Sequence, residues 1–391
     1  MTALSIDALI GNDAEFPVIR RWRFFNHAGV CPLPHRTAAA MNAYAAHAET
    51  DAYLRADWYA RIEALRELAA RLINASPGEI AFVKNTSEGL ATVANGLDWR
   101  AGDRIVTTAV EYPANMYPWM DISRRFNLEL IAIPERTRYD GTVCVPLEDI
   151  LREISHPRTR LVALSHVEFA SGQRHDLATI GRSCRQHGAL FCVDAIQSLG
   201  AMPLDVRQMN IDFLSADGHK WLLGPEGAGI FYCRRELLAQ LRPLIIGWMN
   251  VARAEDYGHY DLTLKDDARR FECGTHNVAG LLGLKASVEL LLTAGIDAVS
   301  RRIKLLTDRL ASGLRDKGYQ VLSPRTGESW SGIISFTTLV HDHAALVRDL
   351  RKAHSIEIAL RVGRLRASPH FYNTEAEIDM LIDRLPHCGI A

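Results

Sequence analysis

Residues 189–197 read ALFCVDAIQ, and residues 212–220 read DFLSADGHK. Each is a mainly apolar run of strand length, and the first ends at Asp194 while the second leads into Lys220. Runs that are apolar at consecutive positions are typical of strands covered on both faces. Similar runs occur at residues 80–84, 104–108, 128–133, 161–165 and 228–233, with helical patterns such as 87–95 and 177–187 between them. The sequence therefore predicts an α/β fold with a large, mostly parallel, seven-stranded sheet.

The character of the sequence changes after residue 250. A polar stretch leads into two helical patterns at 278–292 and 296–317, and short apolar runs then alternate with helical patterns at 344–352 and 374–385. This order predicts a smaller C-terminal α+β domain joined to the sheet domain by a long helix. We therefore expect an N-terminal arm over residues 1–19 and a large domain over 20–250. The connecting segment, the long helix and the small domain would occupy 251–391.

Charge and composition limit the classes of partner. The 391 residues contain 45 lysines and arginines against 46 aspartates and glutamates, so the formal net charge is −1. Binding to nucleic acid or to an anionic membrane surface relies on a clear basic excess, so we expect neither partner. Residues 1–20 lack the pattern of a signal peptide, and no stretch has the apolar length of a membrane span. A cytoplasmic location is the expectation.

The cysteines argue against a metal-binding or disulfide-stabilised fold. There are seven, an odd number, and they are widely spaced without any Cys-x-x-Cys pair. Zinc ribbons and disulfide frameworks require paired, closely spaced cysteines. We predict no metal site.

Polar segments follow five of the predicted strands. They comprise residues 85–89, 111–113, 165–169, 194–197 and 217–220. In open α/β sheets, ligands bind beyond the carboxyl ends of the strands. We therefore expect these segments to converge on one binding site.

The residue types in these segments suit one kind of cofactor. A lysine at a strand end beside glycine, as at Lys220, is suited to forming a Schiff base. Asp194, at the end of an apolar run, needs a cation, which the pyridinium nitrogen of pyridoxal 5′-phosphate (PLP) would supply. Thr86 and Ser87 open a helix, whose N-terminus attracts anions. Taken singly, each residue also fits a simpler role, such as a surface lysine or a helix cap.

Together these motifs resemble the class V aminotransferases, which include the cysteine desulfurases and the isopenicillin N epimerase-like enzymes. The resemblance extends from NHAG at residues 26–29 to RASPHFYNT at residues 366–374. It implies the PLP-dependent transferase fold type I, with Lys220 as the lysine that binds PLP. The remaining cofactor contacts implied are Asp194 with the ring nitrogen, Gln197 with the phenolic oxygen, Tyr112 with the ring face, and Thr86, Ser87 and His219 with the phosphate.

The resemblance also implies a substrate site and a partner subunit. Arg366 matches the arginine that binds the α-carboxylate of an amino-acid substrate, and its planar fork suits a bidentate pair. Arg361 and Arg364 lie close enough in sequence to compete for this role. The residues His27 and Ala28 would lie beside the substrate. Thr275, after Gly274, would reach the phosphate in a neighbouring subunit, so we expect a homodimer with shared active sites.

Three positions depart from the family's pattern. Phe169 stands where an asparagine often contacts the phenolic oxygen, and Glu168 beside it is the candidate substitute. Asp217 stands where a serine often touches the phosphate, which an ionised carboxylate would repel. Residues 361–366 run directly into Arg366 without the nucleophilic cysteine of the desulfurases. Cys31 is the nearest rival thiol.

We therefore predict a PLP-dependent enzyme acting at the Cα of an amino acid, either isopenicillin N epimerase-like or C–S lyase-like. The alternatives are an aminotransferase, a cysteine desulfurase and, from another class, a nonenzymatic PLP-binding module. A dinucleotide-binding domain is disfavoured because no Gly-x-Gly-x-x-Gly opens a helix after an early strand. The candidate enzymes share removal of the Cα proton, with Lys220 as the base. The residues alone leave the fate of the substrate open.

Overall fold

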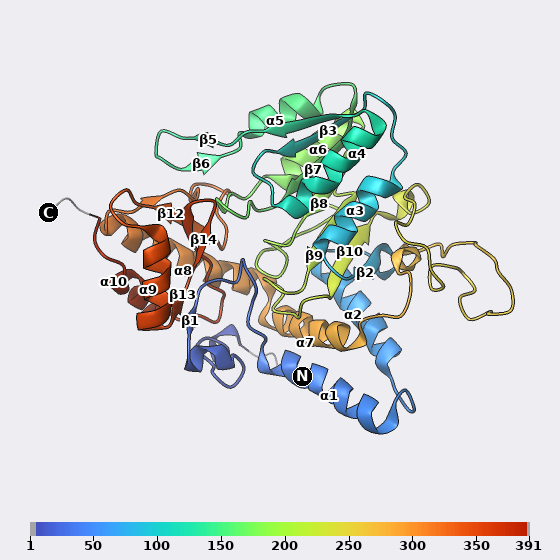
Figure 1. Cartoon of the computed structure of the whole chain (residues 1–391), viewed down its shortest axis with the longest axis horizontal. Coiled ribbons are helices and arrows are strands. Elements are labelled where there is room, and N and C mark those ends of the chain that lie inside the picture. The colour runs from blue at the N-terminus through green and yellow to red at the C-terminus, as the bar shows by residue number, and fades with distance from the viewer. Residues whose placement is uncertain (1–4, 389–391) are drawn as a thin grey trace.

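The computed structural model describes residues 5–388, and its larger part is built on a seven-stranded sheet (Figure 1). The strand order is β2-β10-β9-β8-β7-β3-β4, and β10 is antiparallel to both of its neighbours. The pairs from β9 to β4 are all parallel. This confirms the predicted mostly parallel sheet. Its strands are β2 Ile80–Val83, β3 Arg104–Thr108, β4 Glu129–Ile133, β7 Thr159–Ser165, β8 Leu190–Asp194, β9 Phe213–Asp217 and β10 Gly229–Cys233.

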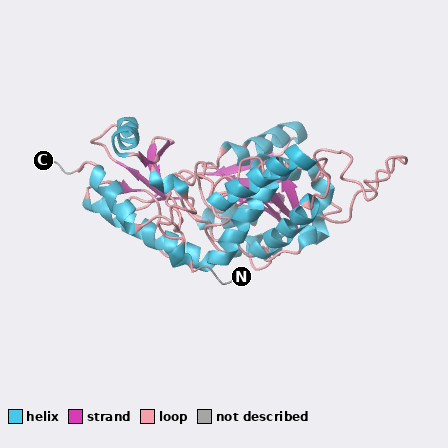
Figure 2. Cartoon of the chain, turned by 90° about the horizontal axis from the view of Figure 1, so that it is seen from below, coloured by secondary structure: helices cyan, strands magenta, loops and turns pink. Residues whose placement is uncertain are grey.

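Helices cover both faces of this sheet (Figure 2). Within β7, Val162 and Leu164 belong to one buried cluster, while Leu161 and Ala163 belong to the other. Because successive side chains of a strand point to opposite faces, burial on both faces explains why the strands are apolar at consecutive positions. The covering helices of the first face are α2 Trp58–Leu72, α5 Leu147–Ile154, α6 Leu177–His187 and α7 Val278–Ala294, and those of the second face are α3 Thr86–Gly96 and α4 Tyr117–Phe126.

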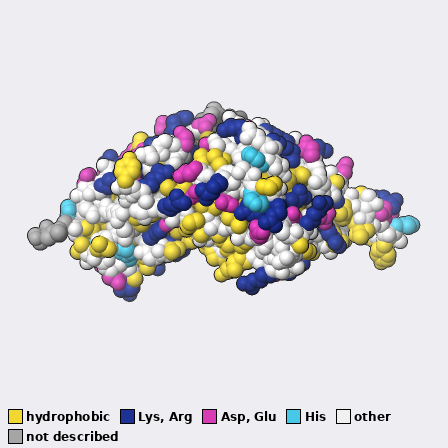
Figure 3. Space-filling view, turned by 90° about the horizontal axis from the view of Figure 1, so that it is seen from above, with side chains coloured by type: hydrophobic (Ala, Val, Ile, Leu, Met, Phe, Trp, Pro, Cys, Tyr) yellow, Lys and Arg dark blue, Asp and Glu magenta, His cyan; other side chains and the backbone are white. Residues whose placement is uncertain are grey.

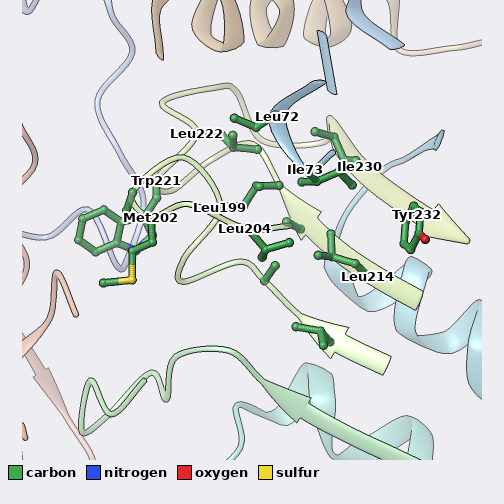
Figure 4. Packing of buried hydrophobic residues seen from close by; sticks show 14 of the residues in the cluster. Leu72, Ile73, Leu199, Met202, Leu204, Leu214, Trp221, Leu222, Ile230 and Tyr232 are labelled. Carbon is green, nitrogen blue, oxygen red and sulfur yellow. The ribbon is translucent and has the colours of Figure 1, made fainter. Parts of the chain in front are cut away.

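The segment after β9 is anchored in the first of these clusters. Trp221 and Leu222, which directly follow Lys220, are buried among Leu199 and Met202 from the chain after β8 (Figure 4). Close packing of large side chains leaves few alternative rotamers. The backbone that carries Lys220 is therefore held rigidly.

A smaller domain follows α7. It contains an antiparallel sheet of order β11-β12-β15-β14, with its own buried cluster. Helix α8 continues from α7 after a bend of 81° at Gly295, so the predicted long connecting helix is two helices. The elements of this domain are α8 Ile296–Asp316, β11 Gln320–Val321, β12 Ile334–Thr337, α9 His343–His354, β13 Ile356–Glu357, β14 Ala359–Arg361, β15 Arg364–Ala367 and α10 Glu375–Arg384.

The N-terminal part of the chain contacts both domains. Strand β1 (Arg23–Phe24) pairs in parallel with β13, whereas α1 (His35–Asp51) and α2 pack against α7. The predicted large domain, 20–250, therefore begins with a strand that pairs with the smaller domain. A two-residue strand carries no periodic signal, so its partner depends on tertiary packing. Residues 1–4 of the predicted arm and 389–391 of the small domain lie outside the described range.

Two further features complete the fold. A hairpin of β5 (Arg136–Thr137) and β6 (Val143–Cys144) extends towards the smaller domain, where the Val143 N–H donates to the Leu322 carbonyl at 2.9 Å (Figure 1). Acidic and basic side chains are interspersed over the face seen in Figure 3. Within residues 5–388, no single helix is long and apolar enough to cross a bilayer, and α7 with α8 meets that measure only as a bent pair.

Candidate functional site

A cavity of about 480 Å³ lies at the carboxyl ends of the central strands, with the β14–β15 hairpin contributing to its wall. Tertiary folding brings together here residues that are far apart in the sequence. Of the residues predicted for the site, those lining the cavity are Ala28, Thr86, Ser87, Tyr112, Asp194, Gln197, His219, Lys220 and Arg366.

The N-terminus of α3 forms one end of the cavity. The Asn85 side chain caps the helix by accepting a hydrogen bond from the Glu88 N–H at 3.0 Å. In the described part of the chain, the backbone N–H groups of Thr86 and Ser87 have no hydrogen-bond acceptor. Free N–H groups and the helix dipole make such an end a binding site for a phosphate.

The Asp217 carboxylate lies beside this helix N-terminus, but both of its oxygens contact neighbouring groups. Its Oδ1 accepts a hydrogen bond from the Gly218 N–H at 2.7 Å, and its Oδ2 lies 2.8 Å from His219 Nδ1. The repulsion expected between Asp217 and a phosphate is therefore offset by the adjacent imidazole when that ring is protonated. The other ring nitrogen of His219 has no partner among residues 5–388 and is available to an anion.

Asp194 is a buried carboxylate, and one of its two oxygens already accepts a hydrogen bond. Oδ1 accepts a hydrogen bond from the Ile196 N–H at 2.9 Å, whereas no described group donates to Oδ2. Burial raises the pKa of Asp194 to about 6, although the Ile196 N–H and Lys220 act in the opposite direction. A cation supplied at the free oxygen would stabilise its ionised form. A protonated pyridine nitrogen fits this requirement.

Lys220 is an almost fully buried amine. Burial lowers its pKa to about 8, and Arg366 lowers it further, while Asp194 partly offsets the effect. Its Nζ lies 5.4 Å from the centroid of the Tyr112 ring. That ring meets Phe169 edge to face at a centroid distance of 5.2 Å. The flat face of Tyr112 is thus held beside the amine.

Gln197 is already hydrogen-bonded on both sides of its amide. Its Oε1 accepts from the Trp221 indole at 2.9 Å, and its Nε2 donates to the Ala28 carbonyl at 3.1 Å. One N–H of the amide remains for a ligand in the cavity. The two contacts also connect the 26–29 turn to the segment that follows Lys220.

Arg366 is a buried cation without a counter-ion. It is 1% exposed, and it donates to the Phe169 carbonyl at 2.8 Å and to Asn26 Oδ1 at 3.3 Å. Among residues 5–388, no carboxylate lies within 4.0 Å of it, and its Nε has no partner. Burial lowers its pKa to about 9, with a further contribution from Arg361. Such a group suits a bidentate pair with a carboxylate that enters the cavity.

Glu168 does not line the cavity, so the structure does not support it as a substitute for the missing asparagine. Its Oε1 instead accepts hydrogen bonds from Thr108 at 2.8 Å and contacts His175 at 3.0 Å. Glu111 is buried nearby and accepts from the Ser165 N–H at 2.7 Å. Burial raises the pKa of both carboxyls, and each pKa shift is enlarged by a neighbouring acid.

The structure also separates two predicted residues from the cavity. His27 is fully buried, and its ring nitrogens contact the Ser368 carbonyl at 2.9 Å and the Tyr372 hydroxyl at 2.7 Å. The prediction that His27 binds substrate is therefore not supported, because its backbone turn faces the cavity while its ring packs inward. Thr275 lines a separate depression of about 310 Å³. Its predicted role requires a second subunit.

Sequence reasoning missed several apolar residues of the wall. Phe24, Val30 and Ala114 line the cavity, but none carries a reactive group that would distinguish it in a sequence. Arg361 also lines it, and its closeness to Arg366 in the sequence was the signal that had marked it as a competing residue. In the described part of the chain, no group of three or more metal-ligating side chains is arranged to hold a metal ion.

The free helix N-terminus, the uncommitted Asp194 oxygen and the buried amine together fit PLP. Comparison with known proteins agrees. The family model described as Aminotransferase class-V matches residues 23–381. A probable cysteine desulfurase of Methanothermobacter thermautotrophicus is 33% identical over 398 aligned positions, which cover 95% of this chain and 96% of that protein.

Solved structures are similar over nearly the whole chain. The cystine C–S lyase C-DES in complex with its product cysteine persulfide is 28% identical with a TM-score of 0.85, covering 94% of this chain and 98% of that one. A lysine-to-alanine mutant of C-DES, with glycine covalently linked to its PLP cofactor, is 27% identical with a TM-score of 0.87, covering 97% and 100%. The chain therefore belongs to the class V aminotransferase family of PLP-dependent enzymes and has their fold type I architecture.

Proposed function

We propose that this protein is a PLP-dependent lyase that breaks the C–S bond of a sulfur-containing amino acid without transferring the sulfur to one of its own cysteines. The similarity to a cystine C–S lyase and to probable cysteine desulfurases supports sulfur chemistry. The observation that carries the choice of a lyase is that no cysteine within residues 5–388 lines the cavity. An isopenicillin N epimerase-like reaction has no comparable support.

The geometry of the β14–β15 hairpin agrees with this choice. The two strands are joined by the two-residue turn Val362-Gly363, and both residues have positive φ values of 49° and 73°. This is the tight turn typical of a short hairpin. It leaves no room for a mobile loop that could bring a thiol to the substrate before Arg366.

The remaining cysteines are poorly suited to accept sulfur. Five of the seven are buried, and burial raises the pKa of Cys31, the rival identified from the sequence, far above its ordinary value. The Cys31 thiol lies 3.6 Å from the Gly224 carbonyl and outside the cavity lining. A thiol must ionise to act as a nucleophile. Cys31 therefore lacks both the ionisation and the position required.

The residues of this chain would hold PLP at defined points. Lys220 would bind its aldehyde carbon covalently, Asp194 would accept a hydrogen bond from its protonated ring nitrogen, and Tyr112 would cover the ring. The N-terminus of α3 and His219 would bind the phosphate. When bound, PLP stabilises negative charge at the Cα of an attached amino acid.

The catalytic residues then control position and protons. Arg366 would bind the substrate carboxylate and so orient the Cα–H bond towards Lys220. The Lys220 amine, released when the amino group of the substrate takes its place on the cofactor and neutral because its pKa is lowered to about 8, would remove the Cα proton. The Cβ–S bond would then break, with its electron pair leaving on sulfur, and Lys220 would return a proton to that sulfur. Water would convert the remaining fragment into pyruvate and ammonia.

The test is product analysis of the PLP-loaded protein with L-cysteine and L-cystine in heavy water. We expect pyruvate, ammonia and a sulfur product in equal amounts, and no persulfide on the intact protein by mass spectrometry. The Cys31→Ser variant should retain most activity, and Lys220→Ala should have none. A keto acid formed without loss of sulfur would identify an aminotransferase, and inverted, deuterated substrate would identify an epimerase. A protein persulfide that disappears together with activity on one Cys→Ser change would identify a desulfurase.

A further inference from the structure

Two arginines of the smaller domain face the same cavity. In the β14–β15 hairpin, Ala359 is opposite Arg366, and Arg361 is opposite Arg364. Directly opposed residues of an antiparallel pair lie on the same face, and residues two positions apart along a strand also share a face. These residues therefore form a basic face. The alternate position, Leu365, points into the core of the domain.

The three arginines of this face differ in whether a carboxylate neutralises them. Arg364 is neutralised by Glu135, whose Oε2 lies 3.2 Å from its Nη1, and it does not line the cavity. Arg361 and Arg366 do line the cavity. Within residues 5–388, neither has a carboxylate within 4.0 Å, and Arg361 donates only to the Leu360 carbonyl at 2.9 Å. Two neighbouring cations thus lack counter-ions.

The other charges of the cavity are accounted for once the proposed cofactor is bound. Asp194 would pair with the cofactor ring, Asp217 lies 2.8 Å from the His219 ring, and Lys220 would be bound to the cofactor or, once the substrate is attached, present as a neutral amine. The α-carboxylate of the substrate supplies one negative charge to Arg366. Arg361 still has no anionic partner, and a partly buried guanidinium that lines the cavity is suited to binding one.

We propose that Arg361 binds a second anionic group of the substrate, located on the substituent beyond the sulfur atom. This inference rests on the proposed C–S lyase function and specifies its substrate class. The preferred substrates are S-substituted cysteines whose substituent bears a carboxylate or a similar oxyanion. Arg366 then binds the carboxylate at Cα, and Arg361 selects the side chain.

The position of Arg361 disfavours a role in binding the cofactor phosphate. The phosphate donors identified above, on α3 and at His219, come from the large domain, whereas Arg361 belongs to the small-domain hairpin beside Arg366. The pKa of Arg366 is lowered by Arg361, as expected for two cations that share the substrate end of the cavity.

A matched pair of substrates tests this inference. S-carboxymethyl-L-cysteine and S-carbamoylmethyl-L-cysteine have nearly the same shape, but only the first carries a second negative charge. We expect the wild-type enzyme to release thiol from the acid with a kcat/KM about tenfold or more above that for the amide, as a lost charge-assisted contact would give. The ratio should fall to near one in Arg361→Gln, mainly through a higher KM for the acid.

Two further variants serve as controls. Arg361→Lys keeps the charge and should retain part of the preference for the acid. Arg364→Gln lies on the same hairpin face but is outside the cavity, so its ratio should equal that of the wild type. A ratio that also collapses in Arg364→Gln would attribute the preference to the general charge of the hairpin and overturn the assignment to Arg361.

Binding measurements separate this inference from the proposed function. Lys220→Ala protein loaded with PLP should bind the acid about tenfold more tightly than the amide by calorimetry, and the double variant with Arg361→Gln should not. Equal binding of the two compounds would overturn the inference, while thiol release from both by the wild type would leave the lyase function intact. Preferential binding of the acid without any thiol release would support the role of Arg361 and contradict the lyase function. A loss of PLP affinity in Arg361→Gln would place the arginine in the cofactor site and also overturn the inference.

Discussion

The hydroxyl of Thr86 accepts a hydrogen bond from the backbone N–H of Asp217 at a distance of 3.0 Å. This contact joins the first residue of α3 to the last residue of β9. It therefore sets the distance between the proposed phosphate site at the helix N-terminus and the turn that carries Lys220. A cofactor that is held at both places depends on this distance.

Thr86→Val should weaken PLP binding because it removes a hydroxyl at the phosphate site and leaves the Asp217 N–H unpaired. A hydrogen bond to a charged group such as the phosphate contributes about 1.5–3 kcal/mol, so the dissociation constant should rise roughly tenfold or more when the hydroxyl is lost. Thr86→Ser retains the hydroxyl and should bind nearly as the wild type does. Equilibrium dialysis of PLP with each apo-protein measures its dissociation constant. Equal affinities of Thr86→Val and Thr86→Ser for PLP would contradict the proposed role of the hydroxyl.

The rate at which the apo-protein takes up PLP should rise with pH around a midpoint near the Lys220 pKa of about 8. The neutral amine is the reactive form, and burial makes it available well below the pKa of an exposed lysine. Arg366→Leu removes a cation and should move the midpoint upwards, whereas Asp194→Asn removes an anion and should move it downwards. Absorbance changes on mixing report the rate, and shifts in the opposite directions would refute this account.

Asp194→Asn should lower the turnover number at least about tenfold while changing PLP affinity little. Asparagine keeps the size and the hydrogen-bonding capacity of the side chain but supplies no charge to keep the cofactor ring protonated. Steady-state kinetics and PLP titration separate these two effects. The exposed helix cap Asp176 provides the control, since Asp176→Asn should leave turnover unchanged. An unchanged rate in Asp194→Asn would remove Asp194 from the active site.

Glu168→Gln should become more stable relative to the wild type as the pH rises from about 5 to 8. Burial raises the pKa of Glu168, so the folded protein keeps a proton that the unfolded chain loses near the ordinary pKa of a glutamate. The stability that protonated Glu168 contributes is therefore fully present below the ordinary pKa of a glutamate. It is lost as the pH rises through the pKa of Glu168 in the folded protein. Thermal unfolding measures the difference in Tm.

The control for this comparison is Glu148→Gln, because Glu148 is exposed on α5. Its difference in Tm from the wild type should not vary in this way with pH. If the Glu168→Gln difference is equally constant, then Glu168 is ionised in the folded protein and this prediction is wrong.

Mixing two inactive variants tests the predicted shared active sites. Thr275 lies outside the cavity of its own chain, so a role at the cofactor requires a second subunit. Lys220→Ala and Thr275→Ala should each be inactive, but their heterodimers would contain one intact site and regain part of the activity. Turnover after subunit exchange is the measurement. A monomer with full activity, identified by sizing, would exclude the shared site.

The sequence by itself determined the positions of the sheet strands and the residues at their carboxyl ends. Strands buried on both faces leave uninterrupted apolar runs, and this local signal located β8 before Asp194 and β9 before Lys220. The convergence of both residues on one cavity follows from the rule for parallel sheets. The family resemblance then linked them to PLP without reference to any long-range contact.

Only the tertiary structure decided how the remaining polar groups are paired. His27 and Tyr372 are far apart in the sequence, and their hydrogen bond turns an expected substrate contact into an internal one. Likewise, Glu135 neutralises Arg364 but leaves Arg361 and Arg366 facing the cavity. Whether a charged side chain is neutralised or free depends on which distant segment packs against it, because burial and ion pairing are properties of the assembled chain.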